Sequence, residues 1–480
     1  MNRQIRRFSL VIIVLYALLF LQLNNVQLRQ AAQYRRDPQN TREIEQAFTR
    51  PRGPIMTADG QIIAESVEVE GELEMLRVYP EGDLYAHTGG FLSLNFGAAG
   101  LERRYNAELS GTTIRQQITS LESLLNDEPT TGTVFTTLDA DIQRAARSAL
   151  AGQRGSVVAM RPSTGEILAM YSNPTFDPND LSSHDLSAVS AIRTELTNDP
   201  QKPLLARTYR ETFEPGSTFK SVTASAGLQS GLVTVTEPVY PVTDSYTPPL
   251  TSRPIRNFAG SSCGGVLEEI LRVSCNTAFA QMGVDLGAEI MVSQAESFGF
   301  NSVPPFQLED GIASVFPAVA AFEQNTPLLA QAAIGQFDVR STPLQMVLVA
   351  SAIANNGIVM EPSLVSSVVD AQGNELISYE PRQWKRAMQP ENANIMRELM
   401  GVVATSGTAR RMLPEGSTGG GKTGTAQLGQ SDLNHAWIIG FAPLQDPDIA
   451  IVVIIESTDG TGGTVAAPVA QEVLRVALAQ

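Results

Sequence analysis

A serine and a lysine three residues apart, Ser217 and Lys220, have the chemistry of a nucleophile beside a base. The stretch STFKSVTASAGLQS follows Pro215-Gly216, which predicts a helix that begins near Ser217 and ends at Gly231. Residues i and i+3 share a helix face, so the Lys220 amine should lie within reach of the Ser217 hydroxyl. A lysine accepts a serine proton only when burial and a neighbouring cation lower its pKa. The pair therefore needs a second lysine from elsewhere in the chain.

Two later segments carry residues of complementary chemistry. Ser274 and Asn276 interrupt two helical runs, VLEEILRV and TAFAQMG, and such an interruption can direct a hydroxyl and an amide into a cleft. Alone, this Ser-x-Asn spacing is more typical of a cap or a turn than of an active site. Lys422-Thr423-Gly424 lies in STGGGKTGTAQ, ahead of two strand-like runs, HAWIIGFAP and DIAIVVIIE. Lys422 is thus a candidate for the second cation.

Residues 416 to 423, GSTGGGKT, also satisfy the phosphate-binding pattern of P-loop ATPases. Such a loop needs an apolar strand before it and a helix that opens at the Lys-Thr pair. Here ARRMLPE precedes the pattern, and GTAQLGQSDLNH follows it with two glycines before the next strand. A P-loop ATPase is therefore disfavoured.

Composition excludes several other classes of protein. The 480 residues suffice for about three domain-sized units, and their net charge of −16 disfavours nucleic-acid binding. The three histidines, His87, His184 and His435, form no cluster with metal-ligand spacing. His184 and His435 have no recognisable partner context, so a Ser-His-Asp hydrolase is also disfavoured.

The N-terminus predicts a membrane anchor. Residues 1–7, MNRQIRR, carry three arginines, and residues 8–28 form an apolar stretch of about 20 residues, enough for a helix to span a bilayer. No small-x-small cleavage site follows, so we interpret the segment as an uncleaved anchor. We expect residues 1–7 in the cytoplasm and residues 29–480 outside it. In that oxidising space Cys263 and Cys275 either form a disulfide or remain two unpaired small hydrophobic residues.

Two regions follow the anchor. Residues 29–131 predict a small, irregular, β-containing pedestal that opens with a hairpin, RPRGPIMTADGQIIAES, turning at Asp59-Gly60. From residue 132 the patterns predict a helix over TLDADIQRAARSALAG and two buried strands joined by PSTG. The late strands and a closing helix, APVAQEVLRVALA, complete the region. Residues 132–480 thus predict an α+β domain whose antiparallel sheet joins parts far apart in sequence.

In this order, Ser217-x-x-Lys220, Ser274-x-Asn276 and Lys422-Thr423-Gly424 resemble the three active-site motifs of penicillin-binding proteins and serine β-lactamases. The chain resembles class B penicillin-binding proteins, the monofunctional peptidoglycan D,D-transpeptidases, over nearly its whole length from residue 50. The resemblance rests on RGPIMTADGQIIAES, GLERRYN, TLDADIQ, STGEILAM, SNPTFDPN, EPGSTFK, SCNTAFAQ, TPLQM and GKTGTAQ. Its compact form is similar to the PbpA-type branch of actinobacteria. One departure is Gly335-Gln336-Phe337, where many relatives have Gly-Gln-Gly.

The resemblance implies a penicillin-binding transpeptidase fold, with an antiparallel sheet flanked by helices, an all-helical subregion and a dimerisation-type pedestal. It makes Ser217 the nucleophile that attacks the bond between two D-alanines of a stem peptide. Lys220 would be its base, kept neutral by the charge of Lys422. Ser274 would relay the proton to the leaving amine, and Asn276 would hold the substrate peptide and the Lys220 amine.

Further roles follow from the same resemblance. Thr423 and Thr425 would bind the terminal carboxylate, and Gly424 would leave room for the substrate to pair along the strand. The backbone N–H groups of Ser217 and Thr425 would form the oxyanion hole, the pair of donors that stabilises the negative oxygen of the intermediate. No metal or cofactor is implied.

The implied partners are stem peptides ending in D-Ala-D-Ala, β-lactam antibiotics that acylate the serine, the membrane, and a polytopic SEDS-type glycosyltransferase (RodA/FtsW-like). A serine β-lactamase and a D,D-carboxypeptidase of the same fold remain alternatives, because these enzymes differ only in whether an amine or water reaches the acyl-enzyme. A non-catalytic β-lactam sensor is a more remote alternative.

Overall fold

The computed structural model describes residues 2–26, 48–71, 73–113, 115–116, 131–429 and 433–479. The first helix, α1 (Asn2–Asn24), contains a stretch, Ile5–Asn24, that is long and apolar enough to cross a membrane. The helix begins before the predicted boundary at residue 8, because the preceding polar residues continue the same helical backbone. Residues 27 and 28 of the predicted span lie outside the described residues.

The pedestal begins with the predicted hairpin. β1 (Ile55–Met56) and β2 (Ile62–Glu68) pair antiparallel, and Gly60, at φ 84°, supplies a left-handed residue in the turn. Short elements make up the rest: β3 (Met75–Val78), η2 (Gly82–Tyr85), α4 (Ala86–Gly89), β4 (Leu92–Ser93), β5 (Gly97–Ala98), α5 (Gly100–Arg104) and α6 (Asn106–Leu109). The sequence does not predict the helices because each is too short to show a helical period.

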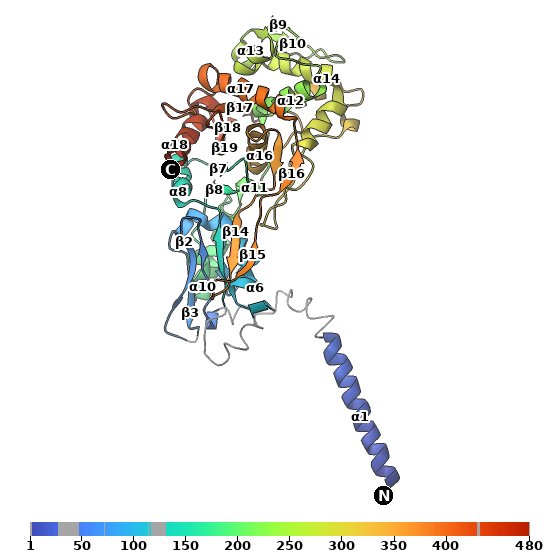
Figure 1. The fold of residues 1–480 in the computed structure, drawn as a ribbon, viewed down its shortest axis with the longest axis vertical. Helices are drawn as coiled ribbons and strands as arrows, with labels where there is room; N and C mark the ends of the chain where they lie inside the picture. Colours follow the sequence, from blue (N-terminus) through green and yellow to red (C-terminus); the bar gives the residue numbers. More distant parts are fainter. Residues whose placement is uncertain are drawn as a thin grey trace.

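The pedestal sheet takes strands from three parts of the chain. β6 (Thr133–Thr136) pairs parallel with β1, and β14 (Val365–Val369) and β15 (Glu375–Ser378) extend the order to β15-β14-β6-β1-β2-β3. Strands on both sides of the predicted boundary at residue 132 therefore share one sheet, which lies at the lower end of the molecule in Figure 1. The hydroxyls of Tyr105 and Tyr379, 2.7 Å apart, add a hydrogen bond between the two regions.

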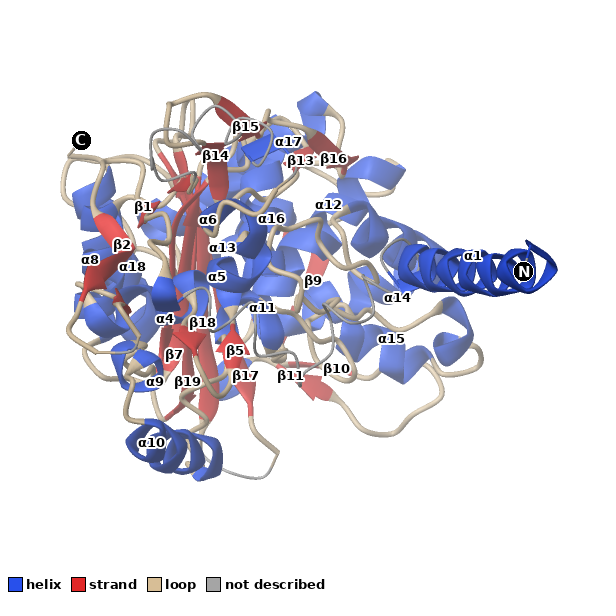
Figure 2. Cartoon of the chain, turned by 90° about the horizontal axis from the view of Figure 1, so that it is seen from below, coloured by secondary structure: helices blue, strands red, loops and turns tan. Residues whose placement is uncertain are grey.

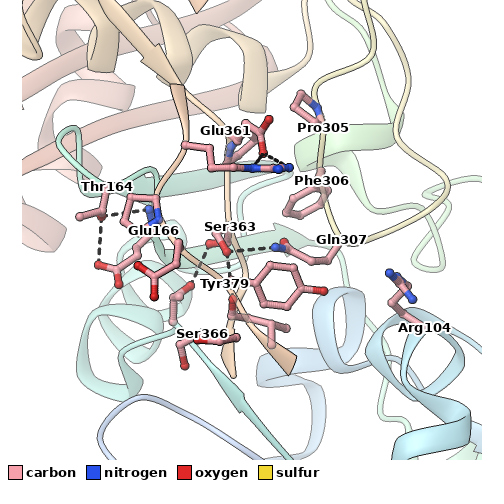
Figure 3. A pocket seen from close by; sticks show the side chains of 17 residues that line it. Arg104, Thr164, Glu166, Pro305, Phe306, Gln307, Glu361, Ser363, Ser366 and Tyr379 are labelled. Atoms are coloured by element: carbon pink, nitrogen blue, oxygen red, sulfur yellow. Dashed lines mark hydrogen bonds and ion pairs between the residues drawn. The ribbon is translucent and has the colours of Figure 1, made fainter. Parts of the chain in front are cut away.

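A pocket of about 470 Å³ lies where these regions meet (Figure 3). Arg104 lines it from α5, whereas Glu166, Gln307 and Tyr379 come from the later chain. Gln307 Nε2 donates a hydrogen bond to Ser363 Oγ over 3.0 Å. The lining contains no residue of the three motifs, so this junction is separate from the candidate site.

The main sheet of the later region has the order β17-β18-β19-β7-β8 and is antiparallel throughout, as the sequence predicts. Its strands come from both ends of the region: β7 (Gly155–Met160), β8 (Ile167–Asn173), β17 (Gly420–Gln427), β18 (Asn434–Ala442) and β19 (Ile449–Thr458). Every residue of β7 is buried, which explains the apolar run without alternation. β17, which carries the third motif, is an edge strand.

Helices cover both faces of this sheet. Figures 1 and 2 agree in placing α8 (Ala140–Leu150) and α18 (Ala467–Ala477) on one side and α16 (Pro343–Ala354) on the other. The side chains of Asp139 and Thr342 cap the N-termini of α8 and α16. The other elements around the sheet are α11 (Arg207–Arg210), β13 (Ile358–Met360), β16 (Gln383–Arg386), α17 (Pro390–Ser406) and a π-helical turn, η6 (Gly462–Ala466). Two helices that follow β8, α9 (Asn179–Ser182) and α10 (Leu186–Asn198), lie beside the pedestal instead (Figure 1).

A mainly helical subregion lies at the end of the molecule far from the pedestal (Figure 1). It contains η3 (Gly216–Phe219), α12 (Lys220–Ser230), α13 (Leu267–Arg272), α14 (Asn276–Ser297), η5 (Val319–Phe322) and α15 (Thr326–Ala332). Two short strand pairs accompany these helices: β9 (Tyr240–Thr243) with β12 (Cys263–Gly265), and β10 (Ser245–Tyr246) with β11 (Ile255–Arg256). A 3-10 turn, η4 (Phe258–Gly260), lies between the second pair and β12. The subregion is therefore not all-helical; strands of two to four residues leave too short a pattern to predict.

Candidate active site

The nucleophile candidate, Ser217, lies in the 3-10 turn η3, which leads directly into α12. Gly231, at φ 72°, ends α12 where the sequence predicts. Gly216 has φ 51°, and a Cβ on it would lie 3.1 Å from the carbonyl oxygen of Thr425. Glycine therefore allows the turn to approach β17 closely. Ser217 is half-buried and lines the cleft between the turn and the strand.

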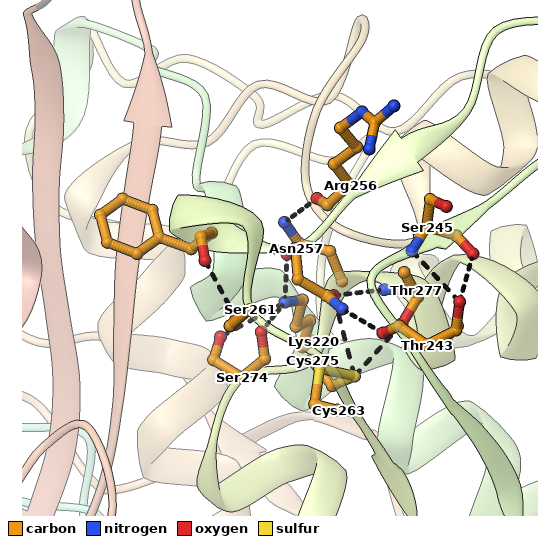
Figure 4. The surroundings of a disulfide bond; sticks show 12 residues. Lys220, Thr243, Ser245, Arg256, Asn257, Ser261, Cys263, Ser274, Cys275 and Thr277 are labelled. Carbon is orange, nitrogen blue, oxygen red and sulfur yellow. Dashed lines mark hydrogen bonds between the residues drawn. A yellow bond between two sulfur atoms is a disulfide. The ribbon is translucent and has the colours of Figure 1, made fainter.

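The second motif forms the turn between α13 and α14. Ser274 has a left-handed backbone, φ 61°, a conformation that costs a non-glycine residue about 1 to 2 kcal/mol. Cys275 forms a disulfide with Cys263 (Figure 4), which resolves the two alternatives that the sequence leaves open. Asn276 Nδ2 donates to the Arg256 carbonyl over 2.9 Å. The disulfide and this hydrogen bond hold the turn against the segment that contains β11 and β12.

Lys220 connects the nucleophile helix to the second motif. Its Nζ donates to Asn276 Oδ1 over 2.6 Å, to the Ser274 carbonyl over 2.7 Å and to Ser274 Oγ over 3.3 Å. The predicted contact with the Ser217 hydroxyl is not among the hydrogen bonds of the described residues. A 3-10 turn nevertheless sets residues i and i+3 one above the other, so both side chains leave the helix on one face.

Lys422 approaches the same serine from the sheet. Its Nζ donates to Ser274 Oγ over 2.8 Å and to the Thr423 carbonyl over 2.9 Å. The Ser274 hydroxyl therefore lies between the amines of Lys220 and Lys422. The structure thus brings together side chains from all three motifs.

Both lysine side chains are fully buried. Burial, followed by the charge of Lys422, holds the pKa of Lys220 well below its usual range, and burial lowers the pKa of Lys422 to about 7. No carboxylate among the described residues opposes either shift. Two buried amines without a counter-ion favour a state with one neutral and one charged lysine, and the neutral amine can accept a proton.

The third motif continues along the cleft. Thr423, Gly424 and Thr425 line it together with residues of the first two motifs. Thr423 Oγ1 donates to Thr408 Oγ1 over 2.6 Å, and Thr425 Oγ1 accepts a hydrogen bond from the Gly462 N–H over 3.4 Å. These contacts fix the two threonine side chains on one side of β17, where they can receive a carboxylate.

Gly424 serves the packing of the site. A Cβ on it would lie 2.7 Å from the Pro215 carbonyl oxygen and 2.9 Å from Thr218 Cγ2. The nucleophile turn therefore occupies the space beside this glycine. The resemblance implied instead that this space is left for the substrate. Its absent side chain is what brings Ser217 close to the strand.

Sequence reasoning missed several residues of the cleft. Four arginines line it: Arg256, Arg272, Arg410 and Arg411. They belong to no motif and come from β11, the end of α13 and one turn, and only the Arg-Arg pair shortly before the third motif offered a signal. The Gly335–Phe337 loop also supports the site, because the Gly335 carbonyl accepts a hydrogen bond from the Gly216 N–H over 3.0 Å. Phe337 has φ 62°, the conformation that suits the glycine found in many relatives.

Two disfavoured alternatives find no support in the structure. The phosphate-binding pattern ends in the edge strand β17, and no helix opens at Lys422-Thr423, so these residues do not form a P-loop. His435 is buried in β18 with its ring against Phe213, and His87 is buried with its Nε2 2.8 Å from the Pro203 carbonyl. Neither histidine lines the cleft that contains Ser217.

Comparison with known proteins covers both regions of the chain. Residues 155–475 match the penicillin binding protein transpeptidase domain, and residues 52–134 match the penicillin binding protein A dimerisation domain. The chain is 39% identical to peptidoglycan D,D-transpeptidase PbpA of Mycolicibacterium smegmatis, covering 100% of this chain and 99% of that protein. It is 36% identical to PbpA of Mycobacterium tuberculosis, again covering 100% and 99%.

Solved structures are similar over the same range. The ceftriaxone acyl-enzyme complex of penicillin-binding protein A from M. tuberculosis has a TM-score of 0.86 at 34% identity, covering 91% of this chain and 100% of that chain. The penicillin G acyl-enzyme complex of the same protein has a TM-score of 0.84 at 35% identity, covering 89% and 100%. Since sequence and fold agree over the pedestal and the catalytic region alike, the chain belongs to the class B penicillin-binding protein transpeptidases, in the group that contains PbpA.

Proposed function

We propose that this protein is a peptidoglycan D,D-transpeptidase with Ser217 as its nucleophile. The observation that carries the proposal is the hydrogen bonding of one hydroxyl, Ser274 Oγ, by two buried lysines, Lys220 and Lys422, beside Ser217. This arrangement supplies a neutral base, a cation and a proton relay in one cleft. Relatives named as D,D-transpeptidases and relatives solved as β-lactam acyl-enzymes support the same chemistry.

In the first half-reaction, Ser217 Oγ attacks the carbonyl carbon between the two D-alanines, and its proton passes to Lys220 Nζ. The N–H groups of Ser217 and Thr425 stabilise the oxyanion; losing such a donor costs roughly 3 to 4 kcal/mol in other enzymes. Ser274 Oγ, hydrogen-bonded to both amines, passes a proton to the departing amine. The C–N bond breaks, D-alanine leaves and an acyl-enzyme remains.

Substrate binding uses the third motif and the open edge of β17. Lys422, Thr423 and Thr425 bind the terminal carboxylate, while the peptide extends the sheet as an added strand and Asn276 holds its amide. In the second half-reaction the amine of another stem peptide attacks the ester, and the new amide forms the cross-link. The amine proton returns to Lys220, and Ser217 regains its hydrogen.

Fluorescent penicillin tests the nucleophile. The purified full-length protein should be labelled, and Ser217→Ala should abolish labelling. Ser221→Ala is the matched control, because Ser221 lies on the same helix with a buried hydroxyl that has no hydrogen-bond partner among the described residues. It should keep the label, since removing such a hydroxyl is close to neutral. Labelling of Ser217→Ala would refute the assignment.

Two further measurements separate the subclasses. The mass of the penicilloyl protein, followed over hours, should persist for a transpeptidase and return to that of the free protein for a β-lactamase. With stem peptides, a transpeptidase yields cross-linked dimers, whereas a carboxypeptidase yields only the shortened peptide.

The proposal places residues 1–7 in the cytoplasm, residues 8–28 in the membrane, and the pedestal and catalytic region, 29–131 and 132–480, outside. The apolar helix α1 supports the anchor, and the Cys263–Cys275 disulfide suits an oxidising space. Protease added to spheroplasts should digest the catalytic region and spare an N-terminal tag; the reverse result contradicts this orientation. A polytopic SEDS-type glycosyltransferase (RodA/FtsW-like) is the proposed partner of the anchor and pedestal, to be tested by co-purification with and without residues 29–131.

A further inference from the structure

The cleft that contains Ser217 is cationic although the chain is acidic. The protein has 50 Asp and Glu residues against 34 Lys and Arg. Among the described residues, the lining of this cleft of about 970 Å³ includes no Asp or Glu, but it includes four arginines: Arg256, Arg272, Arg410 and Arg411. The terminal carboxylate is already provided for by Lys422 and the two threonines of β17. Arg256 and Arg272 have carboxylate partners outside the lining, in Asp244 and Glu269, so the positive charge beyond what the terminal carboxylate requires lies mainly on Arg410 and Arg411.

Arg410 and Arg411 lie side by side in a turn anchored to β17. Thr408 Oγ1, in the same turn, accepts a hydrogen bond from Thr423 over 2.6 Å. The residues flanking the pair are both fully buried: Ala409 and Met412. The two arginines are exposed and form no ion pair with any described residue. The fold thus holds the backbone of this turn in place and leaves both guanidinium groups available to a ligand.

The other two arginines, in β11 and at the end of α13, lie beside the second motif. The Arg256 carbonyl accepts the hydrogen bond of Asn276, and Figure 4 shows the Arg256 side chain directed away from the disulfide. Arg256 forms an ion pair with Asp244 at 3.8 Å, and Arg272 forms one with Glu269 at 3.2 Å. Arg272 ends α13, and its carbonyl oxygen lies 2.6 Å from a Cβ built on Gly407. Arg272 therefore adjoins the turn that carries Arg410 and Arg411.

We propose that Arg410 and Arg411, supported by Arg256 and Arg272, bind a second carboxylate of the stem peptide, on a residue that precedes D-alanyl-D-alanine. This inference rests on the proposed function. A guanidinium group is always charged and binds a carboxylate through paired N–H donors. A carboxamide at the same place offers one oxygen and no charge, so the arginines distinguish free from amidated peptides. The cationic cleft also attracts anionic peptides toward an otherwise acidic protein.

Two synthetic pentapeptides test the proposal on the full-length protein. Both end in D-alanyl-D-alanine, and they differ only in whether the side chain of the third residue ends in a carboxylate or a carboxamide. With a D-amino acid in excess as the acceptor amine, D-alanine release gives kcat and KM for each peptide. We expect KM to be about tenfold lower for the carboxylate, with similar kcat, because the arginines are exposed and their ion pairs modest. The difference should shrink as salt rises from roughly 50 to 500 mM.

Variants locate the effect. Arg410→Gln combined with Arg411→Gln should bring the ratio of the two KM values to within about twofold. Arg253→Gln is the matched control, because Arg253 is an exposed arginine three residues before Arg256 and does not line the cleft. It should keep the ratio. Penicillin acylation, measured on each protein, reports whether Ser217 still reacts.

The two proposals fail in different ways. Equal KM values for the two peptides, or an unchanged ratio in the double variant, would overturn the second carboxylate site while D-alanine release continues. Absence of release from both peptides, together with absence of penicillin acylation, would overturn the proposed function itself.

Discussion

The pedestal and the active site each bury two cationic side chains. In the pedestal, Arg52 and Arg77 both pair with Glu102, over 2.7 and 2.6 Å, and all three side chains are at most 1% exposed. In the active site, Lys220 and Lys422 are equally buried, but they share the neutral hydroxyl of Ser274 instead of a carboxylate. The presence or absence of one anion separates the two groups.

That anion decides how easily a proton moves. Burial alone would raise the pKa of Glu102, but the charges of Arg77 and Arg52 outweigh burial and lower it, so the pedestal group stays charged. Burial lowers the pKa of both lysines, and no described carboxylate counteracts it. A carboxylate beside Lys220 would stabilise its ammonium form and remove the base. Because the active site has no carboxylate beside Lys220, this lysine can remain neutral and accept a proton.

The two regions also differ in how many non-glycine residues have a positive φ. In the described part of residues 48–113, every residue with positive φ is a glycine. The non-glycine residues with positive φ lie from Ala151 onward, and two of them, Ser274 and Phe337, belong to the active-site region. Strain of this kind persists only where the surroundings hold it in place, and it gathers at functional sites.

The largest expected effect comes from Lys220→Met, which removes the buried proton acceptor and keeps most of the side-chain volume. Acylation by penicillin should slow by about 10²- to 10⁴-fold, because the base is lost. The free energy of unfolding should change little, because relief of the burial of the amine offsets the loss of its hydrogen bonds to Asn276 and Ser274. Stopped-flow acylation and urea unfolding measure the two effects. Loss of both stability and acylation would mean that Lys220 is mainly structural.

Glu102→Gln makes the opposite change in the pedestal. It leaves Arg52 and Arg77 buried without their counter-ion, so the free energy of unfolding should fall by about 3 to 5 kcal/mol. Urea unfolding at neutral pH gives the value. Glu472→Gln is the control, because Glu472 pairs with Arg475 through two hydrogen bonds at the surface, where the cost should be below about 1 kcal/mol. A similar loss of unfolding free energy in the two variants would show that burial does not make the Glu102 ion pairs more important than a surface pair.

The sequence predicts the active site better than the pedestal, and the reason is distance along the chain. Ser217 and Lys220 lie on the consecutive elements η3 and α12, and Ser274 and Asn276 lie at one turn, so local spacing reveals each pair. Only the prediction that the three motifs meet in one site depended on the family resemblance.

The pedestal offers no such local pattern. Glu102 lies 50 residues from Arg52 and 25 from Arg77, and nothing near any of the three indicates the others. β14 joins β6 across more than two hundred residues, and strands of four or five residues leave no register signal. The cleft arginines were missed for the same reason, since a strand, a helix end and a turn far apart in the sequence carry them.

The pH dependence of acylation is a milder test of the lysine pair. As pH falls through the lowered pKa of Lys220, the base becomes protonated and the rate falls. As pH rises through about 7, Lys422 loses the charge that attracts the carboxylate, and the rate falls again. The second-order rate constant for penicillin should therefore be bell-shaped, changing by about tenfold per pH unit on each limb.

Lys422→Arg is the control for the alkaline limb. A guanidinium group stays charged throughout this range, so the variant should keep the acid limb and lose the alkaline one. A wild-type rate that stays constant from pH 7 to 9 would show that the charge of Lys422 is not needed, and the contrast with the pedestal would then rest on Lys220 alone.

The smallest expected effect concerns the backbone at Phe337, which is half-buried with φ 62°. Phe337→Gly relieves about 1 to 2 kcal/mol of strain and costs about 0.5 to 1 kcal/mol in chain entropy. Phe337→Ala removes the same ring and keeps the strain. The glycine variant should therefore be more stable to urea than the alanine variant by about 1 kcal/mol. Equal stabilities of the two variants would show that the backbone at Phe337 is not strained.

Acylation of the same two variants shows whether that strain serves the reaction. The Gly335 carbonyl, not the Phe337 side chain, bonds the Gly216 N–H and so supports the turn that presents Ser217. We therefore expect Phe337→Gly to acylate within about twofold of the wild-type rate. In that case the left-handed backbone at Ser274 supports catalysis, because it places a hydroxyl between two lysines, whereas the one at Phe337 is incidental. A larger loss would mean that Phe337 holds the loop behind the nucleophile, and both strained residues would then belong to the catalytic machinery.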